Sequence, residues 1–177
     1  MKYFLILPFI LILWLFYLYY RWKTLKQLLE KVQQKFRELN LLFLERWNRI
    51  PGFVRILRTV MPEERVKIEE LLLLHNHIYD RLQDDEKIKV NERITIVLHG
   101  ILSKINLQEI NLTSNAYQDG KENIMEIETK IASVSREYNS FVLQYQKKKQ
   151  TFGGRFLSRI ANLEDPCLFL VEIEDNG

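Results

Sequence analysis

The chain has 177 residues, of which 47% are hydrophobic and 28% are charged, and its formal net charge is +3 at pH 7. This length is enough for one membrane segment and one domain with a hydrophobic core, and too short for two ordinary domains. The single cysteine, Cys167, excludes an internal disulfide, and the near balance of charges after residue 22 gives no general attraction to nucleic acid.

The first predicted element is the apolar stretch YFLILPFILILWLFYLYY, 18 consecutive uncharged residues at positions 3–20. As a helix, such a stretch covers about 27 Å, close to the thickness of the hydrocarbon core of a bilayer. It ends in aromatic residues suited to a membrane interface, whereas a cleaved signal peptide requires a small-residue cleavage site. We therefore expect a retained transmembrane anchor over residues 1–22 rather than a cleaved secretory signal.

Basic residues are denser after the anchor than before it. Lys2 precedes the anchor, and the following residues are Arg21, Lys23, Lys26, Lys31, Lys35 and Arg37. The positive-inside rule then predicts a single-pass protein with its N-terminus outside and residues 23–177 in the cytoplasm.

Beyond the anchor, apolar residues recur at alternating spacings of four and three, at Leu25, Leu29, Val32, Phe36, Leu39 and Phe43. This heptad stripe predicts a long amphipathic or coiled-coil helix that continues from the membrane segment. Pro51 and Gly52 then interrupt the pattern, since both disfavour a helix interior. We expect a bend there, with Asn48 capping a second helix that turns back along the first.

The second helix is expected to be interrupted near residues 59–61 and to restart at Pro62, and Asp84 or Asp85 is the expected N-cap of a third helix. The third helix spans roughly 88–105, and the pattern over 106–120 is uninformative. A regular stripe over 124–145 predicts a fourth helix, which Gly153 and Gly154 end. A short helix over 155–163 and an apolar, then acidic, tail over 164–177 follow. The fold class is therefore all-α, an N-terminal transmembrane helix followed by an antiparallel four-helix bundle over residues 23–163.

The motifs of catalytic and cofactor sites are missing from the sequence. His75 and His77 lie two residues apart, so on a helix they diverge, whereas paired metal ligands use spacings of three or four. There is no phosphate-binding glycine loop and no Cys-x-x-Cys pair. We expect no catalytic residue, metal site or cofactor, and no enzyme activity.

The densest basic cluster lies near the C-terminal end, at Lys147, Lys148 and Lys149, with Arg155 and Arg159 beyond it. One interpretation is a solvated helix end, and the other is a contact with lipid headgroups or RNA.

Two blocks resemble the LemA family of membrane-anchored bacterial helical proteins. In RWNRIPGFV, the residues Arg46, Asn48, Ile50, Pro51 and Val54 agree with the family element, and Arg49, Gly52 and Phe53 depart from it. The second block agrees at Glu128, Ile131, Ala132, Arg136, Tyr138, Asn139, Val142 and Tyr145, whereas Gln146 replaces an asparagine.

The resemblance implies an all-α bundle on one N-terminal helix in the bacterial cytoplasmic (inner) membrane, without catalytic residues. We expect Arg136 and Asn139 to hydrogen-bond across to the first or second helix and fix its register. The predicted function is a non-enzymatic scaffold or adaptor that binds lipid through its anchor and unidentified membrane or cytoplasmic proteins through its bundle. The alternative is a lipid-binding or envelope-maintenance module that uses Lys147–Lys149 and Arg155. The heptad stripes also permit a homo-oligomer.

Overall fold

The computed structural model describes residues 6–76, 79–107 and 115–170, which contain helices and no strand. The elements are α1 (Ile6–Val60), η2 (Pro62–Glu64), α2 (Arg65–His75), η3 (Tyr79–Arg81), α3 (Asp84–Leu107), α4 (Asn115–Lys149) and α5 (Phe152–Ile160). Residues 163–170, here called the C-terminal segment, follow α5 without helical structure. The prediction of an all-α chain is confirmed.

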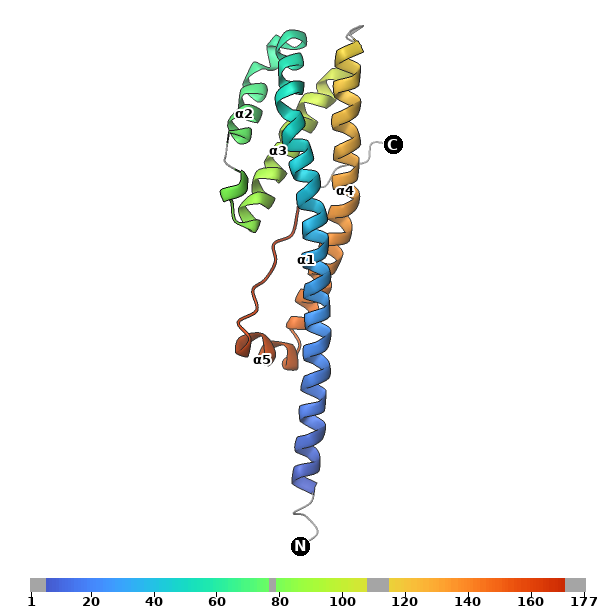
Figure 1. Cartoon of the computed structure of the whole chain (residues 1–177), viewed down its shortest axis with the longest axis vertical. Coiled ribbons are helices and arrows are strands. Elements are labelled where there is room, and N and C mark those ends of the chain that lie inside the picture. The colour runs from blue at the N-terminus through green and yellow to red at the C-terminus, as the bar shows by residue number, and fades with distance from the viewer. Residues whose placement is uncertain (1–5, 77–78, 108–114, 171–177) are drawn as a thin grey trace.

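One helix organises the whole molecule. The 55 residues of α1 form a rod about 80 Å long. The helix α4 lies antiparallel beside α1. The helices α2 and α3 lie around the C-terminal half of α1 (Figure 1). The short α5 lies near the opposite end of the bundle, and α1 continues past it alone.

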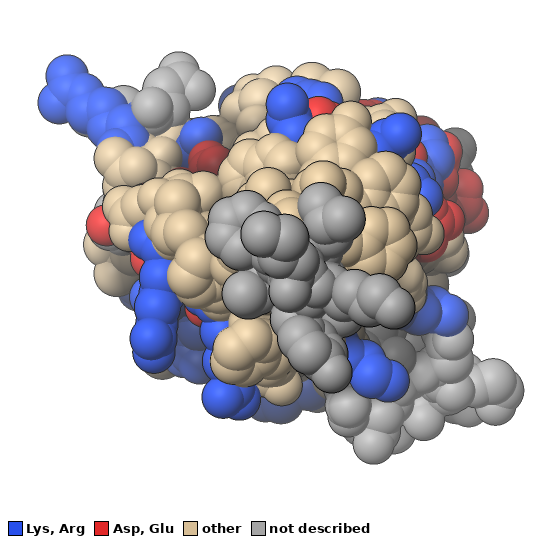
Figure 2. Space-filling view, turned by 90° about the horizontal axis from the view of Figure 1, so that it is seen from below, with Lys and Arg blue, Asp and Glu red and all other residues tan. Residues whose placement is uncertain are grey.

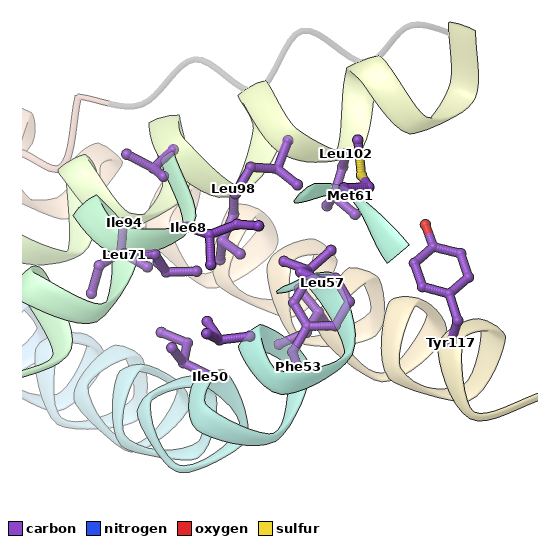
Figure 3. Close-up of a cluster of buried hydrophobic side chains, with 14 residues drawn as sticks. Ile50, Phe53, Leu57, Met61, Ile68, Leu71, Ile94, Leu98, Leu102 and Tyr117 are labelled. Atoms are coloured by element: carbon purple, nitrogen blue, oxygen red, sulfur yellow. The ribbon is translucent and has the colours of Figure 1, made fainter. Parts of the chain in front are cut away.

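The buried apolar side chains form two clusters along α1. The upper core joins residues from α1, α2, α3 and the start of α4, among them Phe53, Leu57, Ile68, Leu98 and Tyr117 (Figure 3). The lower core lies mainly between α1 and α4 and includes Leu39, Phe43, Ile131, Tyr145 and, from the C-terminal segment, Phe169. The predicted stripes on both helices supply most of its residues, so the 3.6-residue periodicity identified the core faces correctly.

The predicted bend at Pro51 is wrong, because α1 runs through this residue without interruption to Val60. A proline inside a helix leaves the carbonyl four residues earlier without its usual donor. Here that carbonyl belongs to Trp47, and His75 of α2 donates from Nε2 to it at 3.0 Å while its ring stacks on the Trp47 indole. Asn48 is exposed within α1 and does not cap a second helix.

The actual corner follows Val60. Pro62 begins a fresh helical turn there, as predicted, and Glu63 and Glu64 complete the turn before α2. At the next corner the predicted capping differs from the structure, since Asp84 lies at the first position of α3 and the Glu86 side chain accepts from the Gln83 backbone N–H at 2.8 Å.

The prediction that Gly153 and Gly154 end the fourth helix is also wrong. The helix α4 ends at Lys149, Thr151 caps α5, and both glycines lie in the first turn of α5. Of the tail predicted over 164–177, residues 164–170 are described, and they pack into the lower core through Phe169.

No helix within the described residues combines enough length with enough hydropathy to span a bilayer. The predicted anchor over residues 1–22 begins with residues 1–5, which lie outside the described residues.

Candidate functional site

The most distinctive surface lies where α5 meets the N-terminal third of α1. The ring of Phe156 in α5 lies 5.9 Å from that of Trp14 in α1. Arg21 in α1 donates to the Thr151 hydroxyl, which also accepts from the backbone N–H of Gly154 as the N-cap of α5. These contacts fix α5 alongside residues 14–21 of α1.

Two glycines permit this close approach. A Cβ atom at Gly153 would lie 3.1 Å from the Tyr17 ring, and one at Gly154 would lie 2.2 Å from the Lys148 carbonyl oxygen. A flexible ring can move aside, but a backbone oxygen in the last turn of α4 cannot do so without moving that turn. Gly154 is therefore the residue that allows the chain to fold back so tightly.

The outward face of α5 is apolar and basic. Phe152, Phe156 and Ile160, spaced four residues apart, are 84%, 43% and 69% exposed. Arg155 and Arg159 are exposed beside them, whereas Gly153, Gly154 and Ser158 are buried on the opposite side. Figure 2 views the molecule from this end and shows uncharged residues across much of the middle of the view, lysines and arginines along its left and lower sides, and acidic residues mainly at its right edge.

The predicted basic cluster divides into two parts. Lys147 and Lys148 are exposed at the end of α4, and Arg155 is exposed on α5. Lys149 instead donates from Nζ to the Leu163 carbonyl oxygen at 2.7 Å and to the Asp165 carboxylate at 2.8 Å. Lys149 thus holds the start of the C-terminal segment, and three of the four residues predicted to contact lipid are accessible.

Arg46, which agrees with the first LemA-like block, lies at the centre of a buried polar network between the two cores. Its side chain is fully buried and forms a 2.6 Å ion pair with Glu128 of α4. It also donates to the Thr95 hydroxyl, and to the Asn91 side-chain and backbone oxygens at 2.7 and 3.0 Å. One guanidinium therefore joins α1, α3 and α4.

This network is suited to fixing helix register rather than to chemistry. The Arg46 side chain is 0% exposed and that of Glu128 is 5% exposed, so neither reaches solvent. Arg46 Nε and Glu128 Oε2 are buried without a hydrogen-bond partner among the described residues. A buried ion pair of this kind contributes more to fixing the register of the helices than to the stability of the fold.

Three residues of α4 that agree with the second LemA-like block hold the C-terminal segment. Tyr138 donates from its hydroxyl to the Cys167 carbonyl oxygen at 2.6 Å. The Asn139 amide donates to the Phe169 carbonyl oxygen at 2.6 Å and accepts from the Phe169 N–H at 2.9 Å. The Tyr145 hydroxyl contacts the Glu164 carbonyl oxygen at 3.3 Å. Because these bonds reach main-chain atoms, α4 recognises an extended backbone.

The prediction that Asn139 fixes the register of the first or second helix is therefore wrong, since its partner is the C-terminal segment. Arg136 donates to the Ala132 carbonyl oxygen of its own helix at 3.3 Å. Burial raises the pKa of the Tyr138 hydroxyl, so this group stays protonated and remains a donor. Of the other family-like residues, Ile50 is buried in the upper core.

Among the described residues, no group of three or more His, Cys, Asp or Glu side chains is placed to hold a metal ion. His75 serves the Trp47 carbonyl, and His77 lies outside the described residues.

Two features of the site were missed in the sequence. Asn91 and Thr95 lie four residues apart on the buried face of α3, and this polar pair was the available indication of a buried charge. The role of Phe169 had only a weak indication, an aromatic residue in the apolar run CLFLV.

No protein-family model matches the chain, and no curated protein sequence matches it significantly. The resemblance to the LemA family therefore stays a prediction.

Proposed function

We propose that this protein is a membrane-tethered, non-enzymatic scaffold whose N-terminal helix anchors the bundle at the bacterial cytoplasmic membrane. The observation that carries the proposal is the exposure of α1 between Phe9 and Tyr20. Its large apolar side chains in this stretch, Leu18 apart, are exposed to between 42% for Trp14 and 69% for Phe16.

A lone helix with apolar side chains on all sides is unfavourable in water. The described helix covers residues 6–20 of the 18-residue apolar run at positions 3–20. Tyr17, Tyr19 and Tyr20 end the run, and Arg21 and Lys23 follow, the order of residues expected at a membrane interface. These features support an anchor over the apolar run, and the resemblance to LemA agrees with it.

The continuity of α1 supports a scaffold. The same helix that carries the proposed anchor extends into the upper core, so α2 and α3 would be held at a fixed distance from the membrane. On α2, Val66 and Leu73 are 81% and 67% exposed and lie seven residues apart on one face. This face is the surface that we assign to a protein partner.

The anchor is tested by alkaline extraction of membranes from cells that produce the full chain. We expect the protein to stay in the membrane pellet, and the double variant Leu11→Lys/Leu13→Lys to be released. Leu73→Lys, which puts a lysine on an exposed leucine of α2, is the control and should stay in the pellet. Release of the unchanged protein into the supernatant would refute the anchor.

The scaffold is tested by a photo-reactive cross-linker at Leu73 in intact cells, with Ser140, exposed on α4, as the control position. We expect a specific adduct with another protein from position 73 only. Recovery of the protein alone, from both positions, would argue against a scaffold. Protease accessibility of the C-terminus in spheroplasts tests the predicted cytoplasmic side.

A further inference from the structure

We propose that α5 is a membrane-surface helix, which lays Phe152, Phe156 and Ile160 into the boundary between headgroups and acyl chains of an anionic bilayer. This inference rests on the proposed anchor and adds a second membrane contact to it. It assigns a role to an exposed face that the anchor alone does not require.

The first argument is position. The ring contact of Phe156 with Trp14 and the bond between Arg21 and Thr151 place α5 beside residues 14–21 of α1. Trp14 lies six residues, about 9 Å, before Tyr20 at the end of the apolar run, and interfacial helices bury their apolar faces about 5–10 Å deep. Since the apolar run ends at Tyr20, α5 lies at the level where α1 would leave the hydrocarbon core.

The second argument is the pattern of exposure on α5. Its inward side is fixed by the buried Gly153, Gly154 and Ser158, so its orientation about its own axis is determined. Phe152 and Ile160 therefore face outward, and the half-exposed Phe156 between them also contacts the Trp14 ring of α1. Phe152, at 84%, is the most exposed large apolar side chain of the described residues.

The third argument is charge. Arg155 and Arg159 lie beside the stripe on α5, and the exposed Lys147 and Lys148 lie at the adjoining end of α4. Of the two acidic residues in the C-terminal segment, Asp165 is paired with Lys149 and Glu164 is exposed. An apolar stripe beside cations is the composition of helices that lie in the plane of anionic membranes.

The test places a fluorophore on α5 of the full-length protein. In a Cys167→Ser background, Ile160→Cys is labelled with an environment-sensitive dye and the protein is reconstituted into phosphatidylcholine vesicles with or without phosphatidylglycerol. Nitroxides attached to lipids just below the headgroups report contact. Leu73→Cys, of nearly equal exposure but on α2, is the matched control.

We expect emission at position 160 to shift to shorter wavelength and to be quenched by the nitroxides, more strongly with phosphatidylglycerol, and emission at position 73 to be unaffected. Replacing both arginines, Arg155→Gln and Arg159→Gln, should remove the extra quenching due to phosphatidylglycerol. A second labelled variant, Phe152→Cys, guards against local misfolding at position 160.

The outcomes separate the two proposals. Protein that an alkaline wash strips from the vesicles contradicts the anchor itself. Protein that stays with the vesicles while positions 152 and 160 remain unquenched contradicts the role of α5 alone. The same holds if a cross-linker at position 160 captures another protein in cells while the dye at that position stays unquenched. Equal quenching in both vesicle types would overturn the selectivity for anionic lipid.

Discussion

The upper core is enclosed by four helices, whereas the lower core lies mainly between α1 and α4 and is closed by the C-terminal segment. In the upper core, apolar side chains from α1, α2, α3 and α4 meet directly (Figure 3). In the lower core, Phe169 packs 5.4 Å from Phe43, and polar side chains of α4 bind the backbone that carries Phe169.

This difference separates two ways of completing a bundle. Two helices alone leave one side of each apolar stripe open to water, and a third or fourth helix normally covers it. Here one extended segment, through the buried Phe169 and the partly buried Leu168, covers part of it beside Tyr79 of η3 and Ile88 of α3. Because that segment has no internal hydrogen bonds of its own, side chains of α4 must satisfy its carbonyl groups. We expect the upper part to unfold as one unit and the C-terminal segment to open locally.

The largest effect should come from Arg46, which ties the two cores together. Arg46→Met leaves the Glu128 carboxylate buried without its cation, and breaking a buried pair in this way costs about 3–5 kcal/mol. The measurement is urea unfolding of the full chain in mild detergent, followed by circular dichroism. The double variant Arg46→Met/Glu128→Leu should recover most of the loss. A single variant as stable as the unchanged protein would contradict the assigned role.

Phe169 tests the lower core. Phe169→Ala removes the only buried side chain of the C-terminal segment and should weaken its docking by about 3 kcal/mol. We expect faster amide hydrogen exchange over residues 163–170 and an unchanged exchange rate in the upper core. Leu170→Ala, at a position that is 73% exposed, is the control and should leave exchange as it was. Equal acceleration in both cores would mean that the two regions unfold together.

Gly154 tests the contact between α4 and α5. Gly154→Ala brings a methyl group against the Lys148 carbonyl oxygen, and such overpacking costs about 2 kcal/mol. We expect α5 to detach locally, which would be measured as faster tryptic cleavage at Arg155 and Arg159. Gly153→Ala is the neighbouring control, because its methyl group meets only the end of the movable Tyr17 side chain. Unchanged cleavage of the Gly154 variant would show that the last turn of α4 moves to accommodate the methyl group at little cost in stability.

His75 tests how α1 tolerates its proline. His75→Ala removes the donor to the Trp47 carbonyl and the stacked ring, and we expect a loss of about 1–2 kcal/mol. In a Pro51→Ala background, residue 51 regains its N–H and can donate to Trp47 itself, so the same change should cost less. The cycle is measured by urea unfolding of the four proteins. An equal loss of stability in both backgrounds would show that His75 does not compensate for the missing N–H of Pro51.

The sequence predicted the helical class and the core faces of α1 and α4 because periodicity is a local property of the chain. It misplaced the first corner because Pro51 alone disfavours a helix, and the residue that compensates, His75, lies 24 positions later. It missed the closing role of Phe169 for the same reason, since the partners of this segment lie on α1 and α4. In this protein, the errors fall where a distant side chain replaces a local hydrogen bond or covers a local gap.

Gly52 gives the smallest effect and the sharpest contrast with Gly154. The alignment with the LemA element left its role unexplained, and in the structure it lies within α1, exposed, with open space where a Cβ atom would be. Gly52→Ala should therefore stabilise the protein by about 0.5–1 kcal/mol, because alanine loses less backbone entropy in a helix. The midpoint of urea unfolding should rise by a corresponding amount without a change in slope. A lower midpoint would mean that α1 needs flexibility beside Pro51, and the rod would then be bent at this point for part of the time.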